Sequence, residues 1–237
     1  MTGVLTIANR DFRALFLSPA GYIVAALFAL ISGIVFTRQV FLPGQPATMS
    51  TLLDFDAVLL LFICPALTMR SICEERKQGT WELLVASPPG MGSIVFGKFL
   101  ACFCFLLILL ILTVPCAVLL EIYGRPDPGE ILSGYLGIGL MGSLYLASGI
   151  LASTIAGSQT IAFLLTVFFW ILVGLAKAGA SVLGDRAADV LFASEPYGRL
   201  QDFTTGLIDT ANIIYFLCGI GMFLLIASGL LELGRRR

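Results

Sequence analysis

The sequence contains no histidine, and only 12% of its 237 residues are Asp, Glu, Lys or Arg. An average soluble domain carries about 25% of these charged residues, so this chain has too little charge to cover a water-exposed surface. A soluble enzyme and a disordered chain are therefore both disfavoured. The lack of histidine excludes imidazole metal sites and histidine acid–base catalysis. The formal net charge of −1, without a long basic stretch, also argues against nucleic-acid binding.

The six cysteines form no CxxC pair, and most of them lie inside apolar runs. Disulfide frameworks are typical of short secreted chains, which this chain is not. With a redox role as the alternative, we expect small buried apolar residues at Cys64, Cys73, Cys102, Cys104, Cys116 and Cys218.

Six apolar runs approach the length of a membrane-spanning helix, which needs about 20 apolar residues. The expected spans are 20–37, 52–69, 99–120, 131–156, 158–176 and 210–231. The second is the weakest, because Asp54 and Asp56 lie in its first turn and Pro65 interrupts its last turn. A re-entrant or partly buried segment is the alternative there. The prediction is a single all-α membrane domain over residues 1–237 with six transmembrane helices.

The distribution of basic residues predicts the orientation. With six spans, both termini and the connection 70–98 share one side of the membrane. That side carries Arg10, Arg13, Arg70, Arg76, Lys77, Lys98, Arg235, Arg236 and Arg237, and the opposite side carries most of the acids. Because cytoplasmic flanks are enriched in Lys and Arg, we expect both termini in the cytoplasm, with the chain in the inner (cytoplasmic) membrane.

Two segments outside the spans have patterns of their own. Residues 4–17 place apolar side chains on one face and Arg10 and Arg13 on the other, before Ser18-Pro19 ends the pattern. We expect an amphipathic helix in the membrane interface, with a helix continuous with the first span as the alternative. The long outer connection 179–209, between the fifth and sixth spans, should contain partial helices, including one at 187–193.

Small residues recur at four-residue spacing in and after the fourth span, at Gly149, Ser153 and Gly157 and at Ser148, Ala152 and Ala156. Small side chains let membrane helices approach closely, so this stripe predicts a packing surface. The alternative is that glycine is simply common in such helices.

Charge within the spans is sparse. The candidates are Asp54, Asp56 and Lys177, and each is expected near the end of a span. Carriers driven by protons or sodium bury acids at mid-membrane, so this mechanism is disfavoured. An apolar or amphipathic cargo fits such spans better.

The stretch Gly92-Ser-Ile-Val-Phe-Gly97-Lys98-Phe99 approaches a nucleotide-binding P-loop. A true P-loop has Ser or Thr after the lysine and a strand before the loop. Here Phe99 follows Lys98 and a Pro-Pro-Gly turn precedes the stretch, so we exclude nucleotide binding. Lys98 is interpreted as a cationic anchor that reaches the inner interface at the start of the third span.

The connection 70–98 is the most polar stretch of the chain. Two acidic and two basic residues at 74–77 are followed by Gly79, which permits a turn, and by apolar residues around Glu82. A short helix with mixed charge and exposed apolar side chains suits docking to a partner protein. A solvated loop with Trp81 as an interfacial anchor is the alternative.

This connection reads Glu74-Glu75-Arg76-Lys77-Gln78-Gly79-Thr80-Trp81-Glu82-Leu83-Leu84, followed by Ser87-Pro88 and Gly97-Lys98-Phe99. It resembles the signature of exporter-type ATP-binding-cassette (ABC) permeases, closest to their gliding-motility and nitrous-oxide-reductase-maturation branch. A second match is Gly206-Leu207-Ile208-Asp209, with Ile214-Tyr215-Phe216 opening the last span. The likeness covers nearly the whole chain, and Trp81 stands where the family usually has Leu.

The resemblance implies a half-transporter with a cytoplasmic coupling helix between spans 2 and 3, seated in a groove of a separate ATPase. By position in the motif, the docking contacts are Glu74, Glu75, Arg76, Gly79, Thr80, Glu82 and Leu83. The implied partners are that ABC ATPase, a second identical or homologous permease subunit, membrane lipids, and an accessory periplasmic or membrane subunit. ATP and magnesium would bind the ATPase, and this chain would hold no cofactor.

The leading prediction is a permease subunit that couples ATP hydrolysis by another subunit to export or membrane assembly. A six-span membrane-integral enzyme or lipid scramblase is the alternative, and a structural membrane assembly factor is a third. A permease should stimulate a P-loop ATPase, whereas an enzyme should retain its activity alone.

Overall fold

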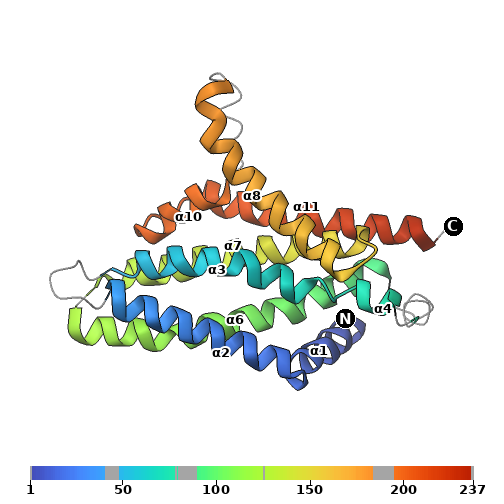
Figure 1. Ribbon diagram of the computed structural model, residues 1–237, viewed down its shortest axis with the longest axis horizontal. Helices are drawn as coiled ribbons and strands as arrows, with labels where there is room; N and C mark the ends of the chain where they lie inside the picture. Colours follow the sequence, from blue (N-terminus) through green and yellow to red (C-terminus); the bar gives the residue numbers. More distant parts are fainter. Residues whose placement is uncertain are drawn as a thin grey trace.

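Long apolar helices dominate the chain in the computed structural model, which describes residues 2–40, 48–77, 79, 90–124, 126–183 and 195–235. In chain order these are α1 (Thr2–Leu17), α2 (Pro19–Val35), the π-helical turn η1 (Phe36–Val40), α3 (Ser50–Thr68), α4 (Cys73–Lys77), α6 (Met91–Gly124), α7 (Pro128–Ile155), α8 (Gln159–Leu183), α10 (Pro196–Thr204) and α11 (Thr210–Arg235) (Figure 1). The described residues contain no strand, in agreement with the predicted all-α fold.

Five helical stretches are long and apolar enough to cross a membrane: Pro19–Val40, Ser50–Lys77, Met91–Gly124, Pro128–Ile155 and Thr210–Leu233. They match five of the six predicted spans. The remaining predicted span, 158–176, falls on α8. Among the residues of α8 with described side chains, the apolar stretch is the shorter Gln159–Leu175. A full crossing by α8 stays a prediction.

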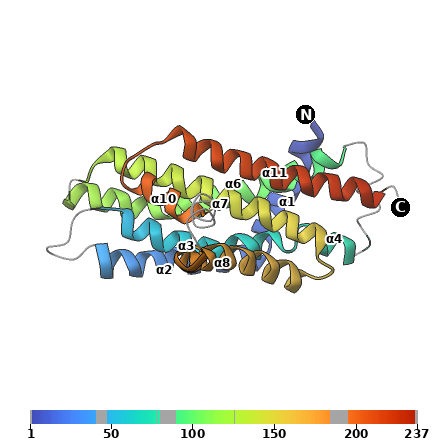
Figure 2. The ribbon, with the colours of Figure 1, turned by 90° about the horizontal axis from the view of Figure 1, so that it is seen from above.

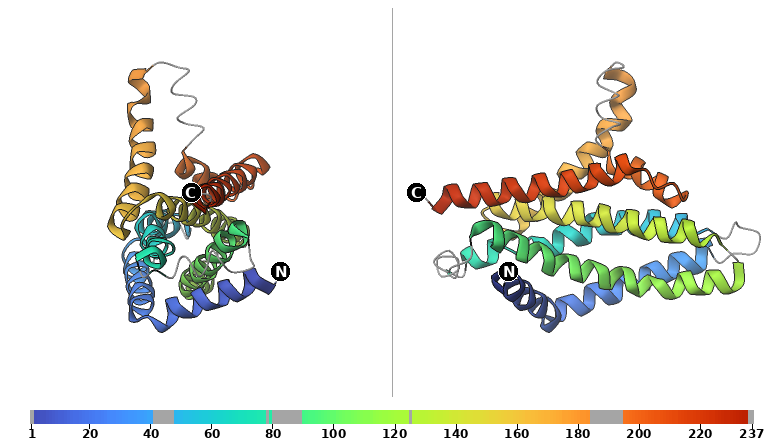
Figure 3. Two further views of the ribbon diagram at one scale, coloured as in Figure 1. Left: turned by 90° about the vertical axis from the view of Figure 1, so that its right-hand side faces the viewer. Right: turned by 180° about the vertical axis from the view of Figure 1, so that it is seen from behind.

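The two ends of the bundle carry different segments. Both termini and α4 lie at one end, named here the α4 end (Figures 1 and 3). At the other, the α10 end, the Ser133 hydroxyl of α7 donates a hydrogen bond to the Phe203 carbonyl of α10 at 2.7 Å. Because α7 finishes at the α4 end, the chain between α7 and α10 has to travel the length of the bundle. On this path α8 leaves the bundle obliquely (Figures 1 and 3).

The central helix is α7, which packs against α3, α6, α8, α10 and α11. Figure 2 shows α11 along one edge of the bundle and α2 and α8 along the other. A Cβ at Gly149 would collide with the Thr68 side chain of α3, so the predicted packing role of the small residues is confirmed there. Gly157 lies beyond the end of α7, and a Cβ there would meet nothing within 4 Å. The predicted stripe is therefore shorter than expected.

Helices α1 and α2 are separate, so the alternative of one continuous N-terminal helix is wrong. Ser18 caps α2 by accepting a hydrogen bond from the Ala20 amide at 3.3 Å. Gly21 permits the tight junction, because a Cβ there would collide with the Leu15 carbonyl. Seen along the bundle, α1 lies across its end (Figure 3, left). This orientation is the one expected of an interfacial amphipathic helix.

Two helices begin before the start of the predicted spans. Helix α6 begins at Met91 rather than at 99, so Lys98 lies inside the helix. Helix α3 begins at Ser50 and continues through Pro65, which places Asp56 in its second turn. Asp56 is completely buried and accepts a hydrogen bond from the Ser32 hydroxyl of α2 at 2.5 Å. A buried acid inside the membrane domain weakens the sequence argument against an ion-coupled carrier.

All six cysteines are free thiols, as expected. Cys64, Cys73 and Cys102 are buried, and Cys104 and Cys116 are half-buried. Cys218 is exposed on α11, so the expectation of burial was wrong for this residue. Only 11% of the most apolar stretch of α11 is buried, which leaves most of this helix for lipid or another subunit.

Candidate functional site

The segment that the sequence predicts to dock a partner begins at α4, which follows the long helix α3 after a short turn. α4 is a five-residue helix at the end of the bundle that holds both termini (Figure 1). Gly79 has a φ of +71°, a left-handed conformation that favours glycine, so the chain turns as predicted two residues after α4. Thr80, Glu82 and Leu83, together with the rest of 80–89, lie outside the described residues.

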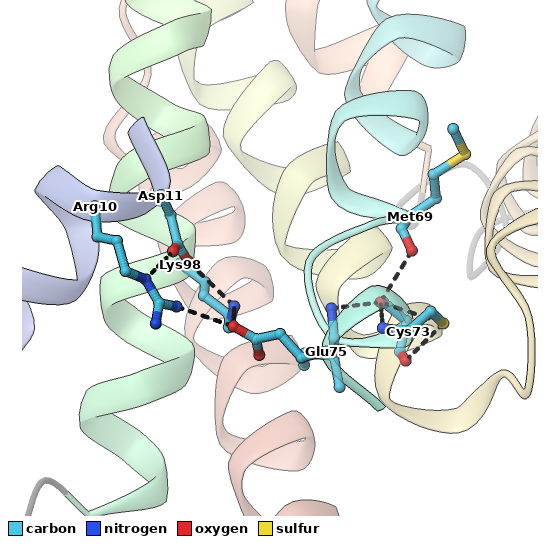
Figure 4. Close-up of polar contacts among 8 residues, drawn as sticks. Arg10, Asp11, Met69, Cys73, Glu75 and Lys98 are labelled. Carbon is cyan, nitrogen blue, oxygen red and sulfur yellow. Dashed lines mark hydrogen bonds and ion pairs between the residues drawn. The ribbon is translucent and has the colours of Figure 1, made fainter. Parts of the chain in front are cut away.

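Ser153, near the end of α7, holds the start of α4. Its hydroxyl oxygen accepts hydrogen bonds from the backbone amides of Ile72 at 3.1 Å and Cys73 at 3.3 Å, and it donates to the Met69 carbonyl at 3.3 Å (Figure 4). Ser153 is completely buried. One side chain thus satisfies amides at the entry of a short helix, which has no intrahelical partners for them.

Two α4 side chains return hydrogen bonds to the carboxyl end of α7. The Cys73 thiol donates to the carbonyls of Ser153 at 3.3 Å and Ala156 at 3.5 Å. The Arg76 guanidinium donates to the Thr154 carbonyl at 2.9 Å. The last carbonyls of a helix have no amide partners of their own, so these contacts satisfy them. α4 and α7 are therefore joined in both directions.

Four alternating charges join α4 to α1 and α6. Lys98 Nζ of α6 lies 2.8 Å from Glu75 Oε1 of α4 and 3.1 Å from Asp11 Oδ2 of α1 (Figure 4). Arg10 bridges the same two carboxylates, at 2.9 Å each. The Lys98 side chain is only 3% exposed, so the interpretation of this residue as an anchor reaching the interface was wrong. Two carboxylates compensate the cost of burying its charge instead.

Polar residues at the α10 end make a different network. The Arg199 guanidinium of α10 donates to the Asn212 side-chain oxygen at 2.7 Å. The side-chain amide nitrogen of Asn212 donates to the Asp202 carboxylate at 2.8 Å. Arg199 also lies over the Tyr215 ring, 4.2 Å from its centroid. Burial, followed by the charge of nearby Asp54, raises the pKa of Tyr197. In the described part of the chain, no group of three or more Cys, Asp or Glu is placed to hold a metal ion.

The comparison with protein families identifies the domain. A family model described as "ABC-2 family transporter protein" matches residues 13–174, from the second half of α1 to the apolar part of α8. The chain belongs to the ABC-2 transporter family. It is therefore a transmembrane permease subunit of an ABC transporter, and a transport component rather than a catalyst. A comparison with the curated proteins finds no match.

The residues predicted to dock the ATPase divide in this permease into two groups. Glu75 and Arg76 bond to α1, α6 and α7, so they hold α4 in place. Glu74 is half-buried and lines a cavity beside α4, whereas Gly79 is exposed. The remaining three positions lie outside the described residues.

Sequence reasoning missed Asp11 and Ser153 as partners of α4. Asp11 is 87 residues from Lys98 and Ser153 is 80 residues from Cys73, so no local pattern joins them. The available signals were indirect: an acid beside Arg10 on the polar face of α1, and a hydroxyl within the small-residue stripe of α7.

Proposed function

We propose that this permease couples ATP hydrolysis by a separate cytoplasmic ATPase to export or to membrane assembly, and that the segment after α4 docks on that ATPase. The observation that carries the proposal is the attachment of α4. It is bonded at once to α1, α6 and α7, although it has only five residues. A force applied beyond Gly79 would therefore reach three helices of the bundle together.

The position of the P-loop-like stretch supports ATP and magnesium binding on another subunit. Residues 92–99 lie in the first turns of α6, and Lys98 is engaged by two carboxylates. A P-loop instead wraps phosphates with a glycine-rich loop that follows a strand. This position of the stretch supports a hydrolytic site on the partner.

We further propose six crossings, with α8 as the fifth and both termini in the cytoplasm of an inner-membrane protein. The need to connect α7 with α10 at the opposite end supports a crossing between them. The Lys and Arg residues near the α4 end support its cytoplasmic side. A second permease subunit, identical or homologous, would cover exposed apolar helices such as α11. The motif at 74–84 supports placement in the gliding-motility and nitrous-oxide-reductase-maturation branch.

Orientation is tested by labelling one engineered thiol at each end. Lys77 at the α4 end and Glu121 at the α10 end are both exposed, and each is replaced by Cys in a Cys218→Ser background. A membrane-impermeant maleimide added to intact cells should label Glu121→Cys and leave Lys77→Cys unlabelled. The opposite pattern refutes the proposed orientation. Native Cys73 is unsuitable, because it is 6% exposed and bonded to α7.

Docking is tested by co-purification of the ATPase with a double variant, Gly79→Arg with Glu82→Arg. The matched control changes the same residue types at the α10 end, Gly124→Arg with Glu121→Arg, where both residues are exposed. The first pair should lose the ATPase with only the small fall in the midpoint of thermal unfolding that a non-glycine residue at the left-handed Gly79 position causes, and the control should retain the ATPase. Retention of the ATPase by the first pair would refute the docking assignment.

A further inference from the structure

A cavity of about 540 Å³ lies at the α4 end, between α1, α2, α4, α6 and the end of α3. Ligand pockets typically measure about 300–1,000 Å³, so this space is large enough for part of a lipid or another small molecule. Apolar side chains form much of its wall, including Leu15, Val24, Leu67 and Ala101. The segment proposed to dock the ATPase begins beside this cavity, since Glu74 and Glu75 also line the cavity.

Three acids, Asp11, Glu74 and Glu75, and two basic residues, Lys98 and Arg70, line the cavity. Asp11, Glu75 and Lys98 line it, but they are bonded to one another and to Arg10. Arg70 is exposed and lines the cavity, and its side chain has no ion pair or hydrogen bond to any residue that the structure describes. A guanidinium that lines a cavity with an apolar wall is complementary to an anion carrying an apolar tail.

A second polar group lies beside Arg70. Ser71 lines the same cavity, and its hydroxyl is shielded from solvent and makes no hydrogen bond among the described residues. Buried hydroxyls normally have a partner, because burial without one costs free energy. A phosphate oxygen held by Arg70 is a suitable acceptor for this hydroxyl.

The location narrows the class of ligand. Residues of α1, α2, α3 and α6 line the cavity, and α1 lies crosswise at this end of the bundle (Figure 3), where lipid headgroups are expected. Basic residues at such a level attract anionic headgroups. We propose that the cavity binds one phospholipid, whose phosphate is held by Arg70 and Ser71 and whose acyl chain lies against the apolar wall. This proposal does not rest on the proposed ATPase docking, although Glu74 and Glu75 of the docking motif also line the cavity.

The test uses the purified full-length permease in detergent, titrated with a short-chain phosphatidylglycerol. Native mass spectrometry counts the bound lipid, and thermal unfolding reports the stabilisation. Arg70→Gln removes the guanidinium, with Arg13→Gln as the control, because Arg13 is also exposed and does not line the cavity. Ala66→Phe fills the cavity, with Ala26→Phe on the exposed face of α2 as its control.

One phosphatidylglycerol should bind per chain. Affinity should fall about ten-fold or more in Arg70→Gln and in Ala66→Phe, and it should be unchanged in both controls. Arg70→Lys should recover part of the affinity, which separates loss of binding from loss of folding. Diacylglycerol without a phosphate and inorganic phosphate alone should each bind much more weakly.

Three results would overturn the proposal. Equal affinity of Arg70→Gln and Arg13→Gln for phosphatidylglycerol would show that Arg70 does not contact the phosphate. Equal affinity of Ala66→Phe and Ala26→Phe places the lipid elsewhere. Binding of diacylglycerol or of inorganic phosphate as tight as that of phosphatidylglycerol contradicts the combined recognition of headgroup and chain.

Discussion

The two ends of the bundle are both polar, but they are built from different interactions. At the α4 end, four full charges alternate around a nearly buried Lys98, and they come from α1, α4 and α6. At the α10 end, neutral Asn212 separates Arg199 from Asp202, and these residues come from α10 and the first turn of α11.

This difference separates two tasks. The ion cluster at the α4 end joins segments up to 87 residues apart, so a displacement of α4 is shared by several helices. The α10 network joins two segments only 10 to 13 residues apart and holds a loop against the bundle. Changes at the α4 end should therefore affect coupling to the ATPase as well as stability, whereas changes at the α10 end should affect stability alone.

The largest effect is expected from Lys98→Met. Removal of the cation leaves Asp11 and Glu75 with side chains only 21% and 16% exposed and without their buried partner. Breaking such a pair should lower the free energy of unfolding by about 3 kcal/mol and reduce ATPase recruitment. Lys77→Met, at an exposed position on α4, is the control and should behave as the unmodified protein. Thermal unfolding and ATPase co-purification measure both effects.

A smaller effect is expected at the α10 end from Gly137→Ala. A Cβ at Gly137 would lie 2.6 Å from the Phe203 Cβ, so α10 has to move away from α7. We expect a loss of about 2 kcal/mol from overpacking, with ATPase binding unchanged. Gly139→Ala is the control on the same helix, since its Cβ would meet only Leu110 at 3.8 Å. Loss of the ATPase from the Gly137 variant would contradict the separation of the two ends.

Ser153→Ala should cost less than either change, about 1.5 kcal/mol, because the amides of Ile72 and Cys73 lose their acceptor. α4 should then be held less firmly, so ATPase stimulation should fall more than ATPase binding. Ser143→Ala is the matched control, because among the described residues the Ser143 hydroxyl bonds only to the Gly139 carbonyl of its own helix. Equal stimulation in the two variants would show that the Ser153 contact does not transmit force.

The smallest effect is expected from Arg199→Lys. A lysine keeps the charge near Tyr215 but lacks the planar fork that reaches Asn212. The loss should be about 0.5 kcal/mol, with normal ATPase binding and stimulation. A measured loss of coupling would place part of the transmission path at the α10 end.

The sequence predicted most of the fold because a membrane imposes a simple length requirement on each span. The apolar runs located α2, α3, α6, α7 and α11, and the two-sided pattern at 4–17 located α1. The main difference lies at the start of α6. Lys98 was taken as a boundary because a charge normally ends an apolar run, yet its charge is buried by partners from distant segments.

The candidate site was predicted only in part for the same reason. The motif at 74–84 predicted docking contacts, which stay a prediction, and it gave no sign of which of its residues hold α4. Glu75 and Arg76 hold α4 through tertiary contacts with α1, α6 and α7. Such contacts leave no periodic pattern in a single sequence. Asp56 shows the same limit, because its partner Ser32 lies on another helix.

The most direct test of the account places a photo-crosslinking amino acid at position 82, beyond α4, and in a second variant at Tyr123, which is 70% exposed at the α10 end. Illumination of intact cells is followed by mass spectrometry of the crosslinked products. Docking of the segment after α4 predicts a crosslink from position 82 to a P-loop ATPase and none to that protein from position 123. A crosslink to the ATPase from position 123, or none from position 82, would contradict it.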